Sequence, residues 1–180
     1  MRYHDEEWGR PVTDDDGLFE RLCLEAFQSG LSWLTILRKR EGFRAAFAGF
    51  HIAAVAAFGD ADVERLLADA AIVRNRSKIE AAIANARVAA ALQAGGETLA
   101  GLVWAHRPPE QPAPVELGDI PAATAESKAL ARALKARGFR FIGPTTAYAL
   151  MQACGLVNDH LASCFVREQA AEAQRLAFAR

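Results

Sequence analysis

Hydrophobic residues recur at helical spacing along most of the chain. The first clear stripe has the i, i+3, i+4, i+7, i+8 pattern and comprises Phe19, Leu22, Cys23, Ala26 and Phe27. This pattern places the apolar side chains on one face of a helix. It predicts a helix that buries that face in a core.

Capping residues predict where the first helices begin and end. Thr13 is the expected N-cap, because Asp14, Asp15 and Asp16 follow it and acids in a first turn complement the helix dipole. Gly30 is the expected stop. Ser32 is expected to cap the next helix, whose end we expect at the basic residues 38–40.

The same signals predict helices through the rest of the chain and no strand, so the fold class is all-α. The expected helices cover residues 52–58, a segment from Asp60, Ser77 to Ala94, Thr124 to Arg137, a pair around Gly155, and a tail at 166–180. Segment 107–118 holds four of the seven prolines and is predicted to be a loop. We expect it to form a seam between two helical groups of one domain, residues 1–180.

Composition narrows the function classes only a little. The chain has 180 residues, 52% of them hydrophobic, and a net charge of −1, so bulk charge does not indicate a nucleic-acid partner. Residues 126–144 nevertheless carry five bases against one acid. Three cysteines do not form a disulfide framework, and no apolar run suits a membrane span or a signal peptide. These features predict a cytoplasmic protein without a membrane partner.

A short hairpin follows the basic stretch and ends at a helix start. Gly143 is expected to permit the turn, and Pro144 suits the first helical position. The backbone N–H groups of Thr145 and Thr146 are then free to bind a phosphate. Together with Ile142, these residues are candidate contacts to a DNA backbone. The alternative is an ordinary helical corner with a solvated basic face.

A carboxylate interrupts the first hydrophobic helix at Glu25. Burying it without partners is costly, so the alternative is that it faces water. Tyr3, Trp8 and Trp33 are nearby in the sequence. Aromatic faces and a carboxylate together suit a cationic or electron-poor base, although such rings are more often core residues.

Two residues with metal-binding side chains stand four apart, at His160 and Cys164. On a helix they would share a face and could bind one ion such as zinc. His4 is a candidate third ligand that would join the chain's start to its end. Chance spacing is the alternative. Cys23 and Cys154 fall in apolar stripes and are expected in the core.

Four blocks of sequence carry a resemblance to a known family. They are Tyr3 to Gly9, Leu18 to Glu41, Arg74 to Ala86 and Arg137 to His160. In these blocks the chain resembles the bacterial 3-methyladenine DNA glycosylase I family of the helix-hairpin-helix superfamily. The blocks run through nearly the whole chain in the family's order.

The resemblance implies a helix-hairpin-helix DNA glycosylase fold with two closely packed lobes and a zinc site joining the termini. It implies a monomer that excises 3-methyladenine from alkylated double-stranded DNA, without a lyase step. The alternatives are a helix-hairpin-helix DNA-binding protein without catalysis, and a zinc-stabilised helical protein with no DNA role.

Roles for individual residues follow from the same resemblance. Glu25, the expected catalytic residue, and Tyr3 would hydrogen-bond the flipped base, Trp33 would stack on it, and Trp8 would line the pocket. Leu31 would fill the gap in the DNA.

The resemblance also implies ligands for zinc and one substitution. His4, His160 and Cys164 match three of the family's four zinc ligands, and the fourth, an upstream Cys, has no counterpart here. Asn158 aligns with the Asp that many related glycosylases carry, with Asp159 as the alternative register.

Overall fold

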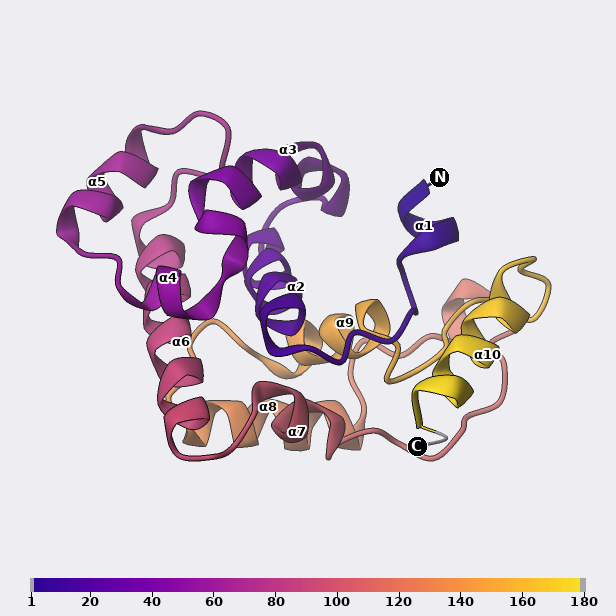
Figure 1. Cartoon of the computed structure of the whole chain (residues 1–180). Coiled ribbons are helices and arrows are strands. Elements are labelled where there is room, and N and C mark those ends of the chain that lie inside the picture. The colour runs from indigo at the N-terminus through magenta and orange to yellow at the C-terminus, as the bar shows by residue number, and fades with distance from the viewer. Residues whose placement is uncertain (1, 179–180) are drawn as a thin grey trace.

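The structure is a computed structural model that describes residues 2–178. Over that range it contains ten α-helices, two 3-10 helices and no strand, which confirms the all-α prediction (Figure 1). The elements are α1 (Arg2–Glu6), α2 (Asp15–Gln28), α3 (Trp33–Ala46), η1 (Ala48–Phe50), α4 (Ile52–Ala56), α5 (Asp60–Ala68), α6 (Arg76–Ala94), α7 (Leu99–Trp104), η2 (Leu117–Asp119), α8 (Ala125–Ala136), α9 (Pro144–Ala153) and α10 (Arg167–Phe178).

The predicted cap at Ser32 is confirmed by a hydrogen bond, since its hydroxyl accepts from the Thr35 N–H at 3.2 Å. At the predicted start of α8, the Thr124 hydroxyl likewise accepts from the N–H of Ser127 at 3.2 Å. Helix α2 starts one residue later than expected. Its N-cap is Asp14, whose carboxylate accepts the Gly17 N–H at 2.7 Å, so the prediction of Thr13 is wrong.

Other element predictions are corrected where tertiary contacts decide the structure. Helix α3 continues past the expected stop at residues 38–40, because Phe43 and Ala46 are buried and make the extension favourable. The second helix of the pair predicted around Gly155 does not form, because residues 154–166 are irregular and the next helix is α10. His160 and Cys164 therefore lie on a loop and not on one face of a helix.

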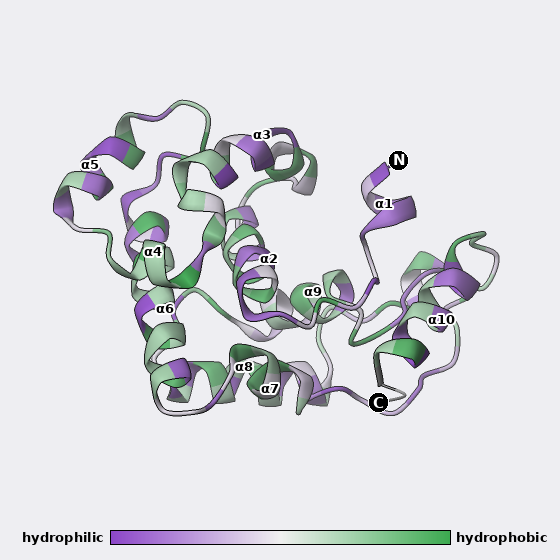
Figure 2. Cartoon of the chain, in the orientation of Figure 1, coloured by the Kyte–Doolittle hydropathy of each residue, from purple (hydrophilic) through white to green (hydrophobic). Residues whose placement is uncertain are grey.

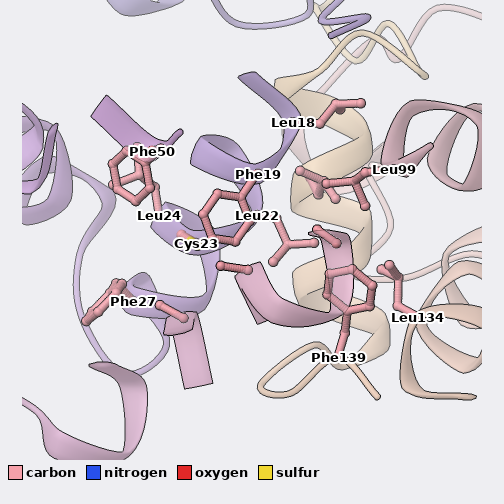
Figure 3. Close-up of a cluster of buried hydrophobic side chains, with 14 of the residues drawn as sticks. Leu18, Phe19, Leu22, Cys23, Leu24, Phe27, Phe50, Leu99, Leu134 and Phe139 are labelled. Carbon is pink, nitrogen blue, oxygen red and sulfur yellow. The ribbon is translucent and has the colours of Figure 1, made fainter. Parts of the chain in front are cut away.

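Helix α2 lies at the centre and packs against α3, α6, α7 and α9. Figure 3 shows its apolar side chains in the core, with residues from the other helices around them. The labelled members are Leu18, Phe19, Leu22, Cys23, Leu24, Phe27, Phe50, Leu99, Leu134 and Phe139. The helix is buried on nearly every side, so a polar residue on it cannot easily reach water.

The remaining helices form two groups that meet at α2. Helices α4 and α5 pack on α6, and α3 packs on η1, whereas α8 packs on both α7 and α9 (Figure 1). Figure 2 shows that hydrophobic positions concentrate in the interior helices, while α1 is largely hydrophilic. Among residues 2–178, no helix is long and apolar enough to cross a membrane.

The chain before α2 crosses closely over the end of α9. The Val12 N–H donates to the Cys154 carbonyl at 3.2 Å. Gly155 has φ +76°, and a Cβ there would lie 2.8 Å from backbone atoms of residues 9–11. The buried Gln174 amide of α10 donates to the carbonyls of Gly9 and Val157, at 3.0 and 3.1 Å. These contacts bring both ends of the chain to one side of α9.

Replacing Gly155 with Ala should therefore destabilise the fold through strain and a backbone clash. We expect a loss of about 2–4 kcal/mol in the free energy of unfolding, measured by urea denaturation. Gly96→Ala is the matched control, because Gly96 also has a positive φ, +80°, with nothing within 4 Å of an added Cβ. The control should lose only about 1 kcal/mol. Equal losses would contradict the close crossing.

Candidate functional site

Glu25 is buried in α2, with 6% of its surface exposed. Burial raises the pKa of its carboxyl group from 4.5 to about 7, and the charge of Arg21 opposes that rise. Arg21 lies four residues earlier, on the same face of the helix. Glu25 therefore does not face water, and its side chain changes charge near neutral pH.

Two aromatic residues accompany this carboxylate. Trp33 begins α3, and its ring lies 5.4 Å from the ring of Tyr3 in α1, at an interplanar angle of 51°. Burial and the nearby charge of Glu25 raise the pKa of the Tyr3 hydroxyl. The Trp33 Nε1 is buried without a hydrogen-bond partner among the described residues. Such a buried donor is rare unless something absent from the protein pairs with it.

A charged network holds the Tyr3 segment in place. The Glu7 carboxylate accepts from Arg40 at 2.6 and 2.9 Å and from Arg21 at 3.2 Å. These partners lower the pKa of Glu7, with the Arg40 hydrogen bonds as the main cause. Sequence reasoning missed this network, because Glu7 and Arg40 are 33 residues apart and no local pattern links them.

Trp8 packs beside two of the chain's four histidines, His4 and His160. Its ring centroid lies 4.7 Å from that of His160 and 6.2 Å from that of His4. Those two histidine rings lie 5.1 Å apart, and the His4 Nε2 lies 3.6 Å from the Cys164 Sγ. The three predicted metal ligands thus come to one corner of the structure.

The ring nitrogens in this corner are arranged asymmetrically. The His4 Nδ1 lies 2.8 Å from an Asp5 carboxylate oxygen, and the His160 Nδ1 lies 2.9 Å from the Asn158 Oδ1. The His160 Nε2 is buried and has no hydrogen-bond partner in the part of the chain that the structure describes. Burial lowers the pKa of His160, which favours the neutral ring that binds metals. Within residues 2–178, no three or more His, Cys, Asp or Glu side chains form a group that could hold an ion.

Asn158, which aligns with the Asp of related glycosylases, has a structural role beside the two histidines. Besides holding His160, its amide donates to the Arg167 carbonyl at 3.1 Å. Asp159 accepts from the Tyr148 hydroxyl at 2.6 Å and from Gln152 at 2.8 Å. Both side chains have structural partners, which sequence reasoning did not anticipate.

Leu31 lies on the turn between α2 and α3 and is 42% exposed. Lys78, near the start of α6, donates to the carbonyls of Phe27 and Ser29 at 2.9 and 2.5 Å. A cation at the end of a helix satisfies its last carbonyls and complements its dipole. The lysine thus anchors the turn that presents Leu31.

The hairpin between α8 and α9 turns differently from the prediction. Gly143 has φ −96° and ψ 174°, an extended conformation, so the expectation that it permits the turn is wrong. Positive φ occurs at Gly138 (+98°) and Phe141 (+59°) instead. A Cβ at Gly143 would meet nothing within 4 Å, so the space beside the start of α9 is open. Pro144 is at the first position of α9, as predicted.

The other predicted hairpin residues divide by burial. Ile142 is partly buried against the core, Thr145 is exposed, and Thr146 is partly buried. The first intrahelical bond of α9 runs from the Ala147 N–H to the Gly143 carbonyl, at 2.8 Å. The backbone N–H groups of Thr145 and Thr146 lie in the first turn, before that bond, where the helix offers them no acceptor.

One helix anchors both the Leu31 turn and the hairpin. Asn85, buried in α6, donates to the Arg140 carbonyl at 3.1 Å and accepts from the Arg140 N–H at 2.7 Å. Lys78 and Asn85 are seven residues apart, so they project from one face of α6, about 10 Å apart along its axis. No local pattern in the sequence signals these two contacts.

Comparison with known proteins now supplies the family. The family model for methyladenine glycosylase matches residues 1–168. The chain belongs to the methyladenine glycosylase family.

The family's characterised members are similar over nearly their whole length. DNA-3-methyladenine glycosylase 1 of Escherichia coli (strain K12) is 50% identical over 166 residues, which are 91% of this chain and 89% of that protein. A crystal structure of 3-methyladenine DNA glycosylase I is 51% identical, with a TM-score of 0.88 and 91% of each chain covered. A tyrosine-to-phenylalanine variant solved in complex with 3-methyladenine is 34% identical, with a TM-score of 0.86 and coverages of 92% and 90%.

The raised pKa of Glu25 predicts a specific pH dependence of stability. The folded pKa, about 7, exceeds the unfolded value of 4.5, so the folded state binds this proton more tightly. Protonation of Glu25 stabilises the folded state most below pH 4.5, and this stabilisation is lost as the pH rises through 7. Glu25→Gln removes this titration, so its stability advantage over the natural chain should grow by about 2–3 kcal/mol between pH 5 and pH 8.

Urea denaturation at the two pH values measures this difference. Glu110→Gln, at an exposed position, is the control and should show no such growth. A constant difference between Glu25→Gln and the natural chain would contradict the raised pKa.

Proposed function

We propose that the protein is a DNA-3-methyladenine glycosylase. It removes 3-methyladenine from alkylated double-stranded DNA by hydrolysing the N-glycosidic bond. The observation that carries the proposal is the buried Glu25 carboxylate, whose charge raises the pKa of Tyr3, together with the Trp33 ring, which packs against Tyr3 and whose Nε1 has no partner among the described residues. The names of the family members support it, because they state this base and this activity.

The chemistry of the lesion suits the charge of this site. A methylated adenine in DNA is cationic, so its glycosidic bond is already weakened. A buried carboxylate is costly on its own, and a cation beside it offsets that cost. Neutral adenine would leave the carboxylate uncompensated. Glu25 would thus favour the charged base, while the face of Trp33 stacks on it and the Tyr3 hydroxyl hydrogen-bonds it.

Base flipping requires contacts outside the pocket. Extruding a nucleotide costs a few kcal/mol, and the gap left in the duplex must be filled. The exposed Leu31 would enter that gap, and the start of α9 would bind the phosphates of a nearby backbone segment. The side chains of Lys78 and Asn85 hold these two elements to one face of α6.

Several finer statements belong to the same proposal. A lyase step needs a free amine in the pocket. The amines of Lys39 and Lys78 both donate to backbone carbonyls, so we expect hydrolysis alone. We further propose a helix-hairpin-helix binding mode, a monomer, and a location in the cytoplasm, where bacterial DNA lies.

Zinc is part of the proposal as a structural ion. The proposed donors are the Nε2 atoms of His4 and His160 and the Cys164 Sγ, which would have to move closer together to bind an ion, because as they lie among residues 2–178 they form no group that could hold one. The unpartnered His160 Nε2 supports the proposal, as do Asp5 and Asn158, which lie at the other ring nitrogens and would orient the two rings. When bound, the ion would tie the two ends of the chain together and add to folding stability.

Base release from methylated duplex DNA tests the enzyme directly, with 3-methyladenine and 7-methylguanine quantified separately. We expect release of 3-methyladenine alone. Glu25→Gln should slow release by about 10- to 100-fold, because a hydrogen bond to a charged group contributes about 1.5–3 kcal/mol. Glu110→Gln is the control. If the natural chain released no base, the non-catalytic DNA-binding alternative would gain support. If Glu25→Gln left release unchanged, Glu25 would not be the catalytic residue.

Lys78→Met should affect DNA distortion and spare the pocket. Removing its bonds to the α2 end frees the Leu31 turn, so excision from duplex DNA should fall about tenfold or more. Binding of free 3-methyladenine, followed by tryptophan fluorescence, should stay within about twofold. A parallel loss of both would show general damage to the fold and contradict the anchoring role.

Cys164→Ser should lower zinc content and stability together. We expect the zinc-to-protein ratio to fall well below that of the natural chain, and the melting temperature to fall by about 5 °C or more. His51→Ala is the control, because His51 pairs with Asp16 and is not one of the proposed zinc ligands. Equal metal content in all three proteins would contradict the proposed site.

A further inference from the structure

Over residues 2–178, three residues other than glycine have a left-handed backbone: Ala48, Phe50 and Phe141. This conformation costs free energy for any residue with a Cβ, and glycine would avoid that cost. At Phe50 the cost has a clear compensation. Its ring is fully buried and lies 5.5 Å from the parallel ring of Phe47.

Phe141 has no comparable compensation within the protein. Its side chain is 47% exposed and is not among the residues that pack on the core. Its neighbours are anchored instead. Phe139 is buried in the core, the Arg140 backbone is clamped by Asn85, and Ile142 packs against the core. The fold thus imposes a glycine-like turn at residue 141 and directs an aromatic ring outward.

The surroundings of this ring indicate its partner. It lies on the hairpin next to the exposed Arg140 and two residues before the open space at Gly143. A cation, an apolar ring and free backbone N–H groups in succession match the phosphates and sugars of a DNA strand. Proteins that approach the minor groove also use apolar side chains, including Phe, against the duplex.

We infer that the Phe141 ring is a DNA contact that packs against a deoxyribose of the strand whose phosphates the hairpin binds. The inference rests on the proposed function, because it names a further contact of the same DNA-binding surface. The contact is apolar, so it adds affinity without reading sequence and without releasing counterions.

Phe141→Gly tests the inference, because it removes the ring and suits the backbone. We expect a melting temperature within about 3 °C of that of the natural chain, because relief of backbone strain offsets the loss of the contacts that the half-buried ring makes. The dissociation constant for a duplex with a tetrahydrofuran abasic analogue, measured by fluorescence anisotropy, should rise at least about fivefold. The slope of log affinity against log salt should not change, whereas Arg140→Ala should reduce it by about one unit.

Ala48→Gly is the matched control, because it relieves the same kind of strain at an exposed position that bears no ring. It should leave DNA affinity unchanged. Unchanged affinity in Phe141→Gly would overturn the inference, and so would a fall of about 10 °C in its melting temperature, which would mark a structural ring. Failure of the natural chain to release 3-methyladenine would instead count against the proposed function.

Discussion

The burial of one carboxylate, that of Glu25, governs the organisation of this protein. Helix α2 is surrounded by other helices, and Glu25 lies between buried residues on it. Removing an ionised group from water is unfavourable, which is why its pKa is raised to about 7. A site that lowers stability in this way is expected where binding uses the charge. We propose that the charge of Glu25 is used here to recognise a base that carries a positive charge.

The rest of the fold places groups around that carboxylate. The salt bridge between Glu7 and Arg40 holds the first segment of the chain over α3, which brings Tyr3 to Trp33. The same segment then crosses Gly155 and places His4 beside the C-terminal loop. The contact between Tyr3 and Trp33 and the histidine corner therefore both result from one path of the chain. Zinc in that corner would stabilise the position of Tyr3 from a distance.

Local sequence patterns predicted the elements that depend on local physics. The apolar stripe of α2, the cap at Ser32 and the start of α8 near Thr124 were predicted because side-chain spacing and short-range hydrogen bonds decide them. The resemblance to a family brought Tyr3 and Glu25 together, and the structure places them near each other. Periodicity alone left open whether Glu25 faced water.

Features that depend on contacts between distant residues were not predictable in this way. The turn of the hairpin was assigned to Gly143, whereas the Asn85 side chain, 55 residues before Arg140, fixes it at Phe141. Likewise, His160 and Cys164 meet His4 through a loop, because chain crossing and not helical spacing brings them together. The residues that spacing selected do lie near His4, but they do not share a helix face.

The ionisation of Glu25 in the folded protein is the most direct test of this account. Carbon-13 labelling of glutamate side chains and an NMR titration from pH 4 to pH 9 would measure it, with Glu25→Gln used to assign the resonance. The account predicts a midpoint of about 7, well above the ordinary value of 4.5. A midpoint near 4.5 would contradict it, since Glu25 would then be a solvated carboxylate with no energetic preference for a cationic base.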